Sequence, residues 1–226
     1  MSEAIREVLD GLDDGPPLGV RRFDRGAALS ARIVVLPSAF NPPTKAHLAL
    51  LDLARQVTGA ARTAALLTTR NVDKGLHGAP LEHRVGMLLA AGEWRGLAVL
   101  TTNAARFVDQ GRALTAAFPG VEVDFVAGYD TLVRIFDTRY YTNMASELAS
   151  FFAAHRLVAT NRGADELAAA RAVLDRLEAR AFADRVLLAE LDPDSAAMSS
   201  TDARSGRQDM LPAGVADYIA QHRLYT

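Results

Sequence analysis

Short apolar runs alternate with longer helical segments through most of this 226-residue chain. The runs that fit strands cover residues 32–36, 63–68, 97–101, 121–126, 157–160 and 185–188. Strands separated by helices of roughly 10–15 residues form βαβ units, whose right-handed crossovers leave the strands parallel. The sequence therefore predicts an α/β fold with a parallel sheet flanked by helices.

The helices are expected between these strands and at both ends of the chain. Their expected ranges are 3–12, 46–57, 81–91, 103–117, a helix from Thr131, 164–180, and two helices that start near Ser200 and Pro212. Residues 137–150 do not fit this alternation and are interpreted as a longer excursion that contains Tyr140 and Tyr141.

Glycine and proline mark the segment before the first predicted strand as irregular. They occur as Gly15-Pro16-Pro17 and Gly26. A chain of this length suits one domain with a small appendage. We therefore expect an N-terminal arm or extension over residues 1–30 and one domain over residues 31–226.

Two chain segments are expected at the edge of the sheet where ligands bind. In open parallel sheets, ligands bind beyond the carboxyl ends of the strands. The strand over 32–36 leads into residues 38–47, and the strand over 121–126 leads into Gly128-Tyr129-Asp130. Gly128 would let a ligand approach the backbone and Asp130 would accept from ribose hydroxyls. An ordinary loop with the same Gly-x-Asp pattern is the alternative.

The first of these segments joins two prolines to a threonine and a histidine. Pro42 and Pro43 lack N–H groups and keep the helix from starting early. Thr44 and His47 are three residues apart, so they share one face of the first helical turn. That position favours phosphate, because a helix N-terminus attracts anions. A purely structural role is open as well, with Thr44 as an N-cap and His47 half-buried.

A second segment near the end of the chain carries hydroxyls and a guanidinium. Ser199-Ser200-Thr201 is followed by Arg204 at the start of a predicted helix. These groups would hold a triphosphate, with the arginine spreading its charge over a leaving pyrophosphate. The structural alternative is an N-cap run followed by a solvated arginine.

Charge and composition narrow the function classes. All but two of the 25 basic residues are arginine, and the two lysines, Lys45 and Lys74, fall in the Thr/His turn and in the loop after the next strand. A lysine ammonium at either position would bind phosphate as a point charge. The alternative is that the two lysines are present by chance. The net charge of −2 argues against a nucleic-acid partner. The absence of cysteine excludes thiolate metal sites and a cysteine nucleophile.

Hydropathy and the N-terminal composition bear on the location of the protein. No apolar run approaches the roughly 18 residues that indicate a membrane helix. The first residues are polar and acidic, which argues against a secretory or mitochondrial leader. We therefore expect a cytoplasmic protein without a membrane partner.

In this order, the segments resemble motifs of the nicotinamide/nicotinate mononucleotide adenylyltransferases, within the HxGH nucleotidyltransferase superfamily. The family's first motif, Gly-Ser-Phe-Asn/Asp-Pro with a later His or Thr and a final His, is similar to residues 38–47. Its Ile-Ser-Ser-Thr-x-x-Arg is similar to residues 198–204, and its Ala-Glu-His-Arg-x-x-Met helix to residues 81–87. Its Leu-Tyr terminus is similar to residues 211–225.

The resemblance implies a Rossmann-like fold of the nucleotidyltransferase type. It also implies transfer of AMP from ATP to nicotinamide or nicotinate mononucleotide, which releases pyrophosphate and forms NAD or deamido-NAD. Mg²⁺ would enter with ATP, bound to phosphates and waters and to no protein ligand. The partners would be these small molecules, and the resemblance leaves a homo-oligomer open.

The resemblance also assigns roles to single residues. The implied catalytic residues are Thr44, His47 and Arg204. The implied ligands of ATP and its phosphates are Ser38, Ala39, Phe40, Lys45, Ser199, Ser200 and Thr201. The implied ligands of the mononucleotide and of ribose are Asn41, Lys74, Gly128, Asp130 and Arg162.

Two departures from the family pattern keep other functions open. Ser38 stands where the first motif has glycine, and its side chain would crowd the phosphates or require an unusual backbone conformation. Residues 101–104 contain no aromatic where eukaryotic members stack the pyridine ring, and Trp94 is expected in the core. The alternatives are a related nucleotidyltransferase with a different acceptor and a non-catalytic nucleotide-binding module.

Overall fold

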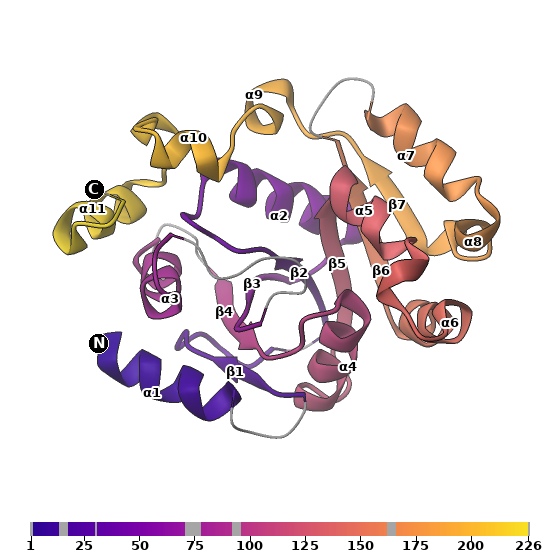
Figure 1. Ribbon diagram of the computed structural model, residues 1–226, viewed down its shortest axis with the longest axis horizontal. Helices are drawn as coiled ribbons and strands as arrows, with labels where there is room; N and C mark the ends of the chain where they lie inside the picture. Colours follow the sequence, from indigo (N-terminus) through magenta and orange to yellow (C-terminus); the bar gives the residue numbers. More distant parts are fainter. Residues whose placement is uncertain are drawn as a thin grey trace.

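One sheet organises the chain in the computed structural model, which describes residues 2–13, 18–29, 31–70, 78–91, 96–161 and 166–225. The strands are β1 (Val20–Arg22), β2 (Arg32–Pro37), β3 (Arg62–Thr68), β4 (Leu97–Thr102), β5 (Glu122–Gly128), β6 (Arg156–Thr160) and β7 (Val186–Ala189). Their order across the sheet is β1-β4-β3-β2-β5-β6-β7 (Figure 1). All neighbours pair in parallel except β1 and β4. The predicted α/β fold with a parallel sheet is confirmed.

The six predicted strands are all present, and the sequence missed only β1 among the strands described. This strand has three residues and pairs antiparallel with β4, with Val20 opposite Thr102. Two of its three residues are arginines, so it shows no apolar alternation. Tertiary contacts fix it in place: Gly19 N–H donates to Asn103 Oδ1 at 2.8 Å, and Thr102 Oγ1 donates to the carbonyl of Gly19 at 2.7 Å.

Alternate strand residues face two helical layers. Ile33 and Val35 pack with α4 (Phe107–Ala117), α5 (Tyr129–Ile135), α6 (Met144–Ala154), α7 (Glu166–Leu174) and α8 (Leu177–Arg180). Val34 and Leu36 pack on the opposite face with α1 (Ser2–Asp13), α2 (Lys45–Thr58) and α3 (Leu81–Ala90). The strands are therefore buried on both faces, as parallel sheets usually are.

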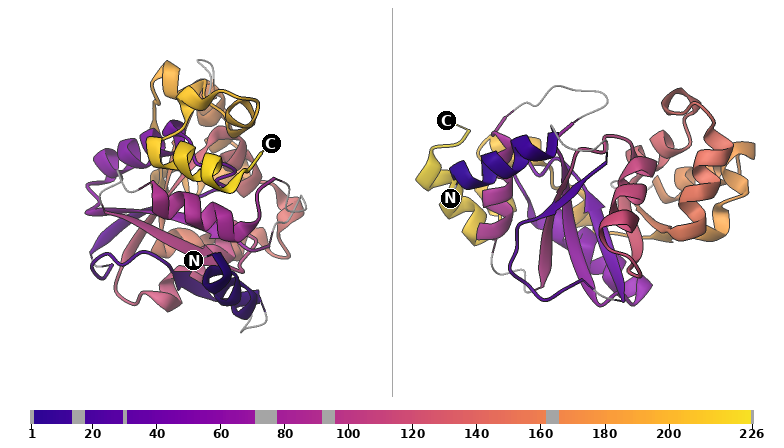
Figure 2. Two further views of the ribbon diagram at one scale, coloured as in Figure 1. Left: turned by 90° about the vertical axis from the view of Figure 1, so that its left-hand side faces the viewer. Right: turned by 90° about the horizontal axis from the view of Figure 1, so that it is seen from below.

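The two ends of the described chain meet on helix α3. Helix α1 lies along one side of α3 and α11 (Ala213–His222) along the other (Figures 1 and 2). On the α1 side, Arg6 forms an ion pair with the buried Glu82, with its Nε donating to Oε1 at 3.0 Å. On the α11 side, Tyr218 packs so closely that a Cβ on Gly86 would lie 2.2 Å from its hydroxyl. The proposed division of the chain at residue 30 stays a prediction.

The predicted helices are present, with two corrections. The helix expected from residue 103 starts at Phe107, because the N–H of Ala104 donates to Thr102 Oγ1 at 3.1 Å and holds a turn there. The helix expected over 164–180 is divided into α7 and α8, because Arg176 adopts an extended conformation with ψ of 151°.

The segments near the C-terminus and the excursion are short and irregular. Residues 137–150 hold a 3-10 turn, Thr138–Tyr140, and most of α6. The helices before α11 are α9 (Pro193–Ala196) and α10 (Ser200–Arg204). In the part of the chain that the structure describes, no helix has the length and apolarity needed to cross a membrane.

Candidate active site at the carboxyl ends of the strands

The loop between β2 and α2 forms the base of the site. Phe40 is completely buried and has a φ of 43°, a left-handed conformation that turns the chain back towards α2. Its ring packs against the imidazole of His47, with centroids 4.9 Å apart. The phenyl ring therefore supports one side of the imidazole from the core.

Thr44 and His47 form the predicted pair at the start of α2. Thr44 is the N-cap residue, and its backbone N–H donates to His47 Nδ1 at 3.0 Å. Its hydroxyl lies 2.8 Å from the same nitrogen. The N-cap interpretation is therefore confirmed, and the cap also fixes the orientation of the imidazole. His47 Nε2 lies 3.1 Å from Ser38 Oγ on the other side of the ring.

The second segment docks directly onto this loop. Ser200 Oγ donates to the carbonyl of Pro42 at 2.8 Å. Arg204 donates to the carbonyl of Asn41, and its Nη2 lies 3.1 Å from Thr201 Oγ1. Segments that are some 160 residues apart in the sequence therefore form one surface.

Ser199 has a capping role in this surface. It is the N-cap of α10, where its Oγ accepts from the N–H of Asp202 at 3.1 Å. The same Oγ donates to the carboxylate of Asp202 at 2.7 Å. The N-cap alternative for the serine run is confirmed at Ser199, whereas Arg204 bonds to the loop instead of extending into solvent.

A cavity of about 320 Å³ lies between the two segments and the ends of β2, β5 and β6. The predicted site residues that line it are Ser38, Ala39, Phe40, Asn41, Thr44, His47, Gly128, Ser199, Ser200, Thr201 and Arg204. Among the described residues of this lining, none carries a carboxylate. The wall thus offers hydroxyls, an imidazole and a guanidinium, which are donors suited to phosphate oxygens.

Two predicted site residues that the structure describes do not line this cavity. Lys45 is exposed, and its Nζ donates to the backbone carbonyl of Asp209 at 2.8 Å. Asp130 is exposed in the first turn of α5. Lys74 and Arg162 lie outside the described residues, as does Trp94.

Asn41 lines the cavity but also has a structural role. Its Oδ1 accepts from the hydroxyl of Tyr225 at 2.6 Å and from the N–H of Ala79 at 3.1 Å. Gly78 approaches it so closely that a Cβ there would lie 2.3 Å from Asn41 Nδ2. This side chain ties the loop to the C-terminal end of the chain.

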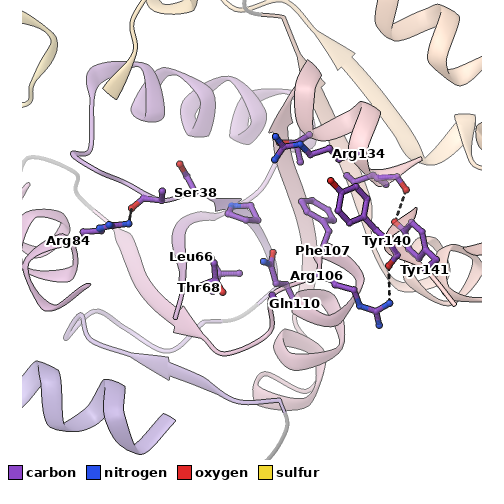
Figure 3. A pocket seen from close by; sticks show the side chains of 15 residues that line it. Ser38, Leu66, Thr68, Arg84, Arg106, Phe107, Gln110, Arg134, Tyr140 and Tyr141 are labelled. Carbon is purple, nitrogen blue, oxygen red and sulfur yellow. Dashed lines mark hydrogen bonds between the residues drawn. The ribbon is translucent and has the colours of Figure 1, made fainter. Parts of the chain in front are cut away.

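A second cavity of about 260 Å³ adjoins the first and shares Pro37, Ser38, Ala39 and Thr131 with it. Figure 3 shows its aromatic wall, where Phe107 from α4 faces Tyr140 and Tyr141 from the excursion. Sequence reasoning missed this wall. Phe107 follows the end of β4 by five residues and so lies beyond residues 101–104, where the family pattern places an aromatic, and the motifs assign no role to Tyr140 and Tyr141.

Charge in the second cavity is partly neutralised by neighbours. Arg106 donates from Nε to Asp109 at 2.7 Å and pairs with Glu147 at 2.9 Å. The hydrogen bond to Asp109 raises the pKa of Arg106. Burial raises the pKa of Tyr141, whose hydroxyl donates to the carbonyl of Ile135 at 2.6 Å. Tyr141 is therefore neutral, and its hydroxyl is committed to the backbone.

Arg84 connects helix α3 to the floor shared by the two cavities. It is almost fully buried, and burial lowers its pKa. Its Nε donates to the carbonyl of Ala79 at 2.7 Å, and its Nη1 donates to the carbonyl of Ala39 at 3.3 Å. The guanidinium therefore holds the loop after β2 in place through the carbonyl of Ala39.

Comparisons with known proteins agree with this geometry. The model of the cytidylyltransferase-like family matches residues 35–206. The probable nicotinate-nucleotide adenylyltransferase of Symbiobacterium thermophilum is 31% identical over 208 residues, which cover 86% of this chain and 95% of that protein.

Solved structures share the fold. The nicotinic acid mononucleotide adenylyltransferase of Plasmodium falciparum in complex with NaAD has a TM-score of 0.65 and 17% identity, over 86% of this chain and 97% of that one. The complex of the same enzyme with APC has a TM-score of 0.62, 16% identity and the same coverage of both chains. The chain therefore belongs to the cytidylyltransferase-like nucleotidyltransferases and, among them, to the nicotinamide/nicotinate mononucleotide adenylyltransferase family.

Proposed function

We propose that this nucleotidyltransferase transfers AMP from ATP to nicotinamide or nicotinate mononucleotide, releasing pyrophosphate and forming NAD or deamido-NAD. The observation that carries this proposal is the docking of Ser200 and Arg204 onto the loop that holds Thr44 and His47. Residues that served only as helix caps would not need these hydrogen bonds between the two segments. A triphosphate, in contrast, needs donors on both of its sides.

The first cavity is the proposed ATP site. Thr44 and His47, at the start of α2, would bind the α-phosphate. Ser199, Ser200, Thr201 and Arg204, on the segment that docks onto the same loop, would bind the β- and γ-phosphates. The substrate is the magnesium complex of ATP, in which Mg²⁺ keeps several waters and needs no protein carboxylate.

The second cavity is the proposed acceptor site. Its aromatic wall offers a stacking surface for a pyridine ring, in place of the aromatic side chain that residues 101–104 lack. Because the two cavities share Ser38 and Ala39, the phosphate of the acceptor would meet the α-phosphate of ATP there. Lys74, Asp130 and Arg162 stay predicted ligands of the mononucleotide.

The reaction needs positioning and charge neutralisation more than covalent help. An oxygen of the acceptor phosphate bonds to the α-phosphorus, and the bond from that phosphorus to the bridging oxygen breaks. The bridging oxygen leaves with the electron pair as part of pyrophosphate. Donors fixed in advance stabilise the extra negative charge of this transition state. The small-molecule substrates suit this activity, whereas the cytoplasmic location, the absence of nucleic-acid and membrane partners and a homo-oligomer stay predictions.

The test is pyrophosphate release from ATP and Mg²⁺ with nicotinamide and nicotinate mononucleotide assayed in parallel. Arg204→Ala is expected to lower kcat by roughly 10²–10³, since it removes a donor at the charged transition state. Arg207→Ala is the matched control, because this nearby arginine is exposed and pairs with Asp209 outside the cavity.

Three outcomes separate the candidate functions. Turnover with one acceptor, retained in Arg207→Ala and lost in Arg204→Ala, supports the proposal and names the substrate. Pyrophosphate release only with another phosphorylated acceptor identifies a related nucleotidyltransferase. ATP binding without release for any acceptor contradicts catalysis and leaves a nucleotide-binding module.

A further inference from the structure

A buried glutamine on α4 carries an acceptor atom that no group of the described chain satisfies. Gln110 is 5% exposed and lines the second cavity. Its Nε2 donates to the carbonyl of Ala104 at 3.3 Å. A carbonyl can only accept, so this bond fixes which end of the amide is the nitrogen. The other end, Oε1, is buried and has no hydrogen-bond partner among the described residues.

An unsatisfied buried acceptor is unfavourable, and folded proteins keep few of them. A leucine would fill a similar volume without this cost. In the wall of a ligand cavity the acceptor has a use, because a bound molecule can donate to it. The last torsion of a glutamine side chain is soft, so a small rotation of the amide presents Oε1 to a ligand.

Gln110 lies next to the aromatic wall of the second cavity. Phe107 precedes it by three residues in α4, so the two side chains share one face of the helix. Figure 3 shows both side chains in this cavity, with Tyr140 and Tyr141 of the excursion on the far side of Phe107. A pyridine ring stacked on this wall would therefore bring its substituent within reach of Gln110.

Other polar groups of the same wall already have protein partners. The hydroxyl of Tyr141 donates to the carbonyl of Ile135 at 2.6 Å. Arg106 donates to Asp109 at 2.7 Å and pairs with Glu147 at 2.9 Å. The glutamine oxygen differs from these groups because its hydrogen bond is still to be made.

The two candidate acceptors differ only in the substituent of the pyridine ring. The carboxamide of nicotinamide mononucleotide has two N–H donors, and one of them can satisfy Oε1. The carboxylate of nicotinate mononucleotide is ionised at neutral pH and can only accept. It would leave Oε1 unsatisfied and place acceptor oxygens against each other.

We propose that Gln110 selects nicotinamide mononucleotide over nicotinate mononucleotide, with Oε1 accepting a hydrogen bond from the carboxamide of the ring. The inference rests on the proposed adenylyl transfer and goes beyond it by choosing between the two acceptors. Arg134, an exposed residue of α5 that lines the same cavity, is the group that would favour a carboxylate.

The ratio of kcat/KM for the two acceptors, measured with ATP and Mg²⁺, tests this selection. The wild type should prefer nicotinamide mononucleotide by at least roughly tenfold, since the wrong acceptor leaves a buried polar group unpaired. Gln110→Leu should reduce the preference to about threefold or less, because the discriminating oxygen is gone. The loss should fall on nicotinamide mononucleotide, with no loss for nicotinate mononucleotide.

Two further variants control for folding and for the substitution itself. Gln110→Met keeps the length of the side chain without its oxygen, and it should give the same reduced ratio if the leucine variant folds poorly. Gln56→Leu is the matched control and should keep the wild-type ratio, since Gln56 is exposed on α2 and lines neither cavity.

Binding of the dinucleotides does not require turnover. By calorimetry, NAD should bind the wild type roughly tenfold more tightly than deamido-NAD, and the two should bind Gln110→Leu about equally. Absence of turnover with both acceptors would count against the proposed function, whereas this binding ratio would still test Gln110. Failure of both dinucleotides to bind would overturn the inference as well.

Two results in the rate assay would overturn the inference. The first is a wild-type preference for nicotinate mononucleotide, and its loss in Arg134→Ala would assign the ring substituent to that arginine. The second is an acceptor ratio that stays the same in the wild type, Gln110→Leu and Gln110→Met. Gln110 would then serve only to hold the carbonyl of Ala104.

Discussion

Asn41 shows how a single side chain can join distant parts of the site. Its Oδ1 receives hydrogen bonds from Tyr225 and from the N–H of Ala79, and its carbonyl receives one from Arg204. Burial raises the pKa of Tyr225 to about 12, so its hydroxyl is protonated at neutral pH and donates. The residue predicted to bind the mononucleotide is thus also the attachment point of the C-terminal end.

Tyr225→Phe is therefore expected to affect both stability and substrate binding. The change removes one hydrogen bond and little volume, which costs about 1 kcal/mol and lowers Tm by roughly 2–4 °C. The KM for ATP should rise several-fold, because Asn41 carries the carbonyl that holds Arg204. Thermal melts and initial rates check this. An unchanged KM would show that the C-terminal contact does not reach the site.

At the scale of elements, helix α3 connects the ends of the chain to the site. It packs between α1 and α11, and its Arg84 holds the carbonyl of Ala39. Gly86 has no side chain, so Tyr218 can approach the backbone of α3 at this position. A shift of α3 would therefore move the loop on which the phosphates are expected to bind.

Two glycines give a matched test of this packing. Gly86→Ala places a Cβ 2.2 Å from the hydroxyl of Tyr218, and we expect it to destabilise the protein by roughly 1–3 kcal/mol. Gly11→Ala in α1 meets no atom within 4 Å and should stabilise by roughly 0.5–1 kcal/mol, because alanine is the better helix former. Urea unfolding of both variants measures the difference. Equal stabilities would contradict the close packing of α3 and α11.

The ion pair between α1 and α3 predicts a pH dependence. Burial alone would raise the pKa of Glu82, but hydrogen bonds from its own backbone and from Arg6 outweigh it and lower the pKa overall. A lowered carboxyl pKa stabilises the fold above the unfolded value, and this contribution is lost as the pH falls through the folded value.

Arg6→Ala should therefore lower Tm at neutral pH. The difference from the wild type should shrink as the pH falls through the lowered folded pKa of Glu82, where this carboxylate becomes protonated. Thermal melts between acid and neutral pH measure this, with Arg21→Ala as an exposed control on the same N-terminal segment. A Tm difference that stays constant with pH would assign the effect to packing and not to charge.

At the scale of the whole molecule, two cavities meet at one sheet edge. The ends of β2, β5 and β6 contribute to the first, and the ends of β2 and β3 with the start of α4 contribute to the second. This arrangement follows from parallel strands, whose carboxyl ends all point to the same edge. Two anionic substrates are thereby brought together over donors that the fold holds in place.

The increase in thermal stability caused by a bound nucleotide tests whether the first cavity is the ATP site. Mg²⁺ and ATP at about a hundred times Kd should stabilise the fold by roughly 2.7 kcal/mol, which corresponds to a Tm increase of roughly 5–10 °C. Removal of Mg²⁺ with EDTA should abolish most of this increase, because the unshielded triphosphate binds less well. Arg204→Ala should reduce it as well. A Tm shift that is the same with and without EDTA would contradict binding of the magnesium complex.

The sequence alone predicted the parallel sheet and the six regular strands, and the resemblance of its motifs predicted the eleven residues that line the first cavity. Apolar periodicity and turn residues are local signals, so they can be read from the chain. The antiparallel strand β1, the break between α7 and α8 and the aromatic wall of Phe107, Tyr140 and Tyr141 were decided only by tertiary structure. Each of these features depends on a neighbour that is distant in sequence, or on a backbone conformation that the local amino-acid composition does not indicate. The hydrogen bond between Ser38 and His47 also depends on tertiary structure. The motif places both residues near the expected phosphates, but only the folded loop determines which imidazole nitrogen lies beside the serine hydroxyl.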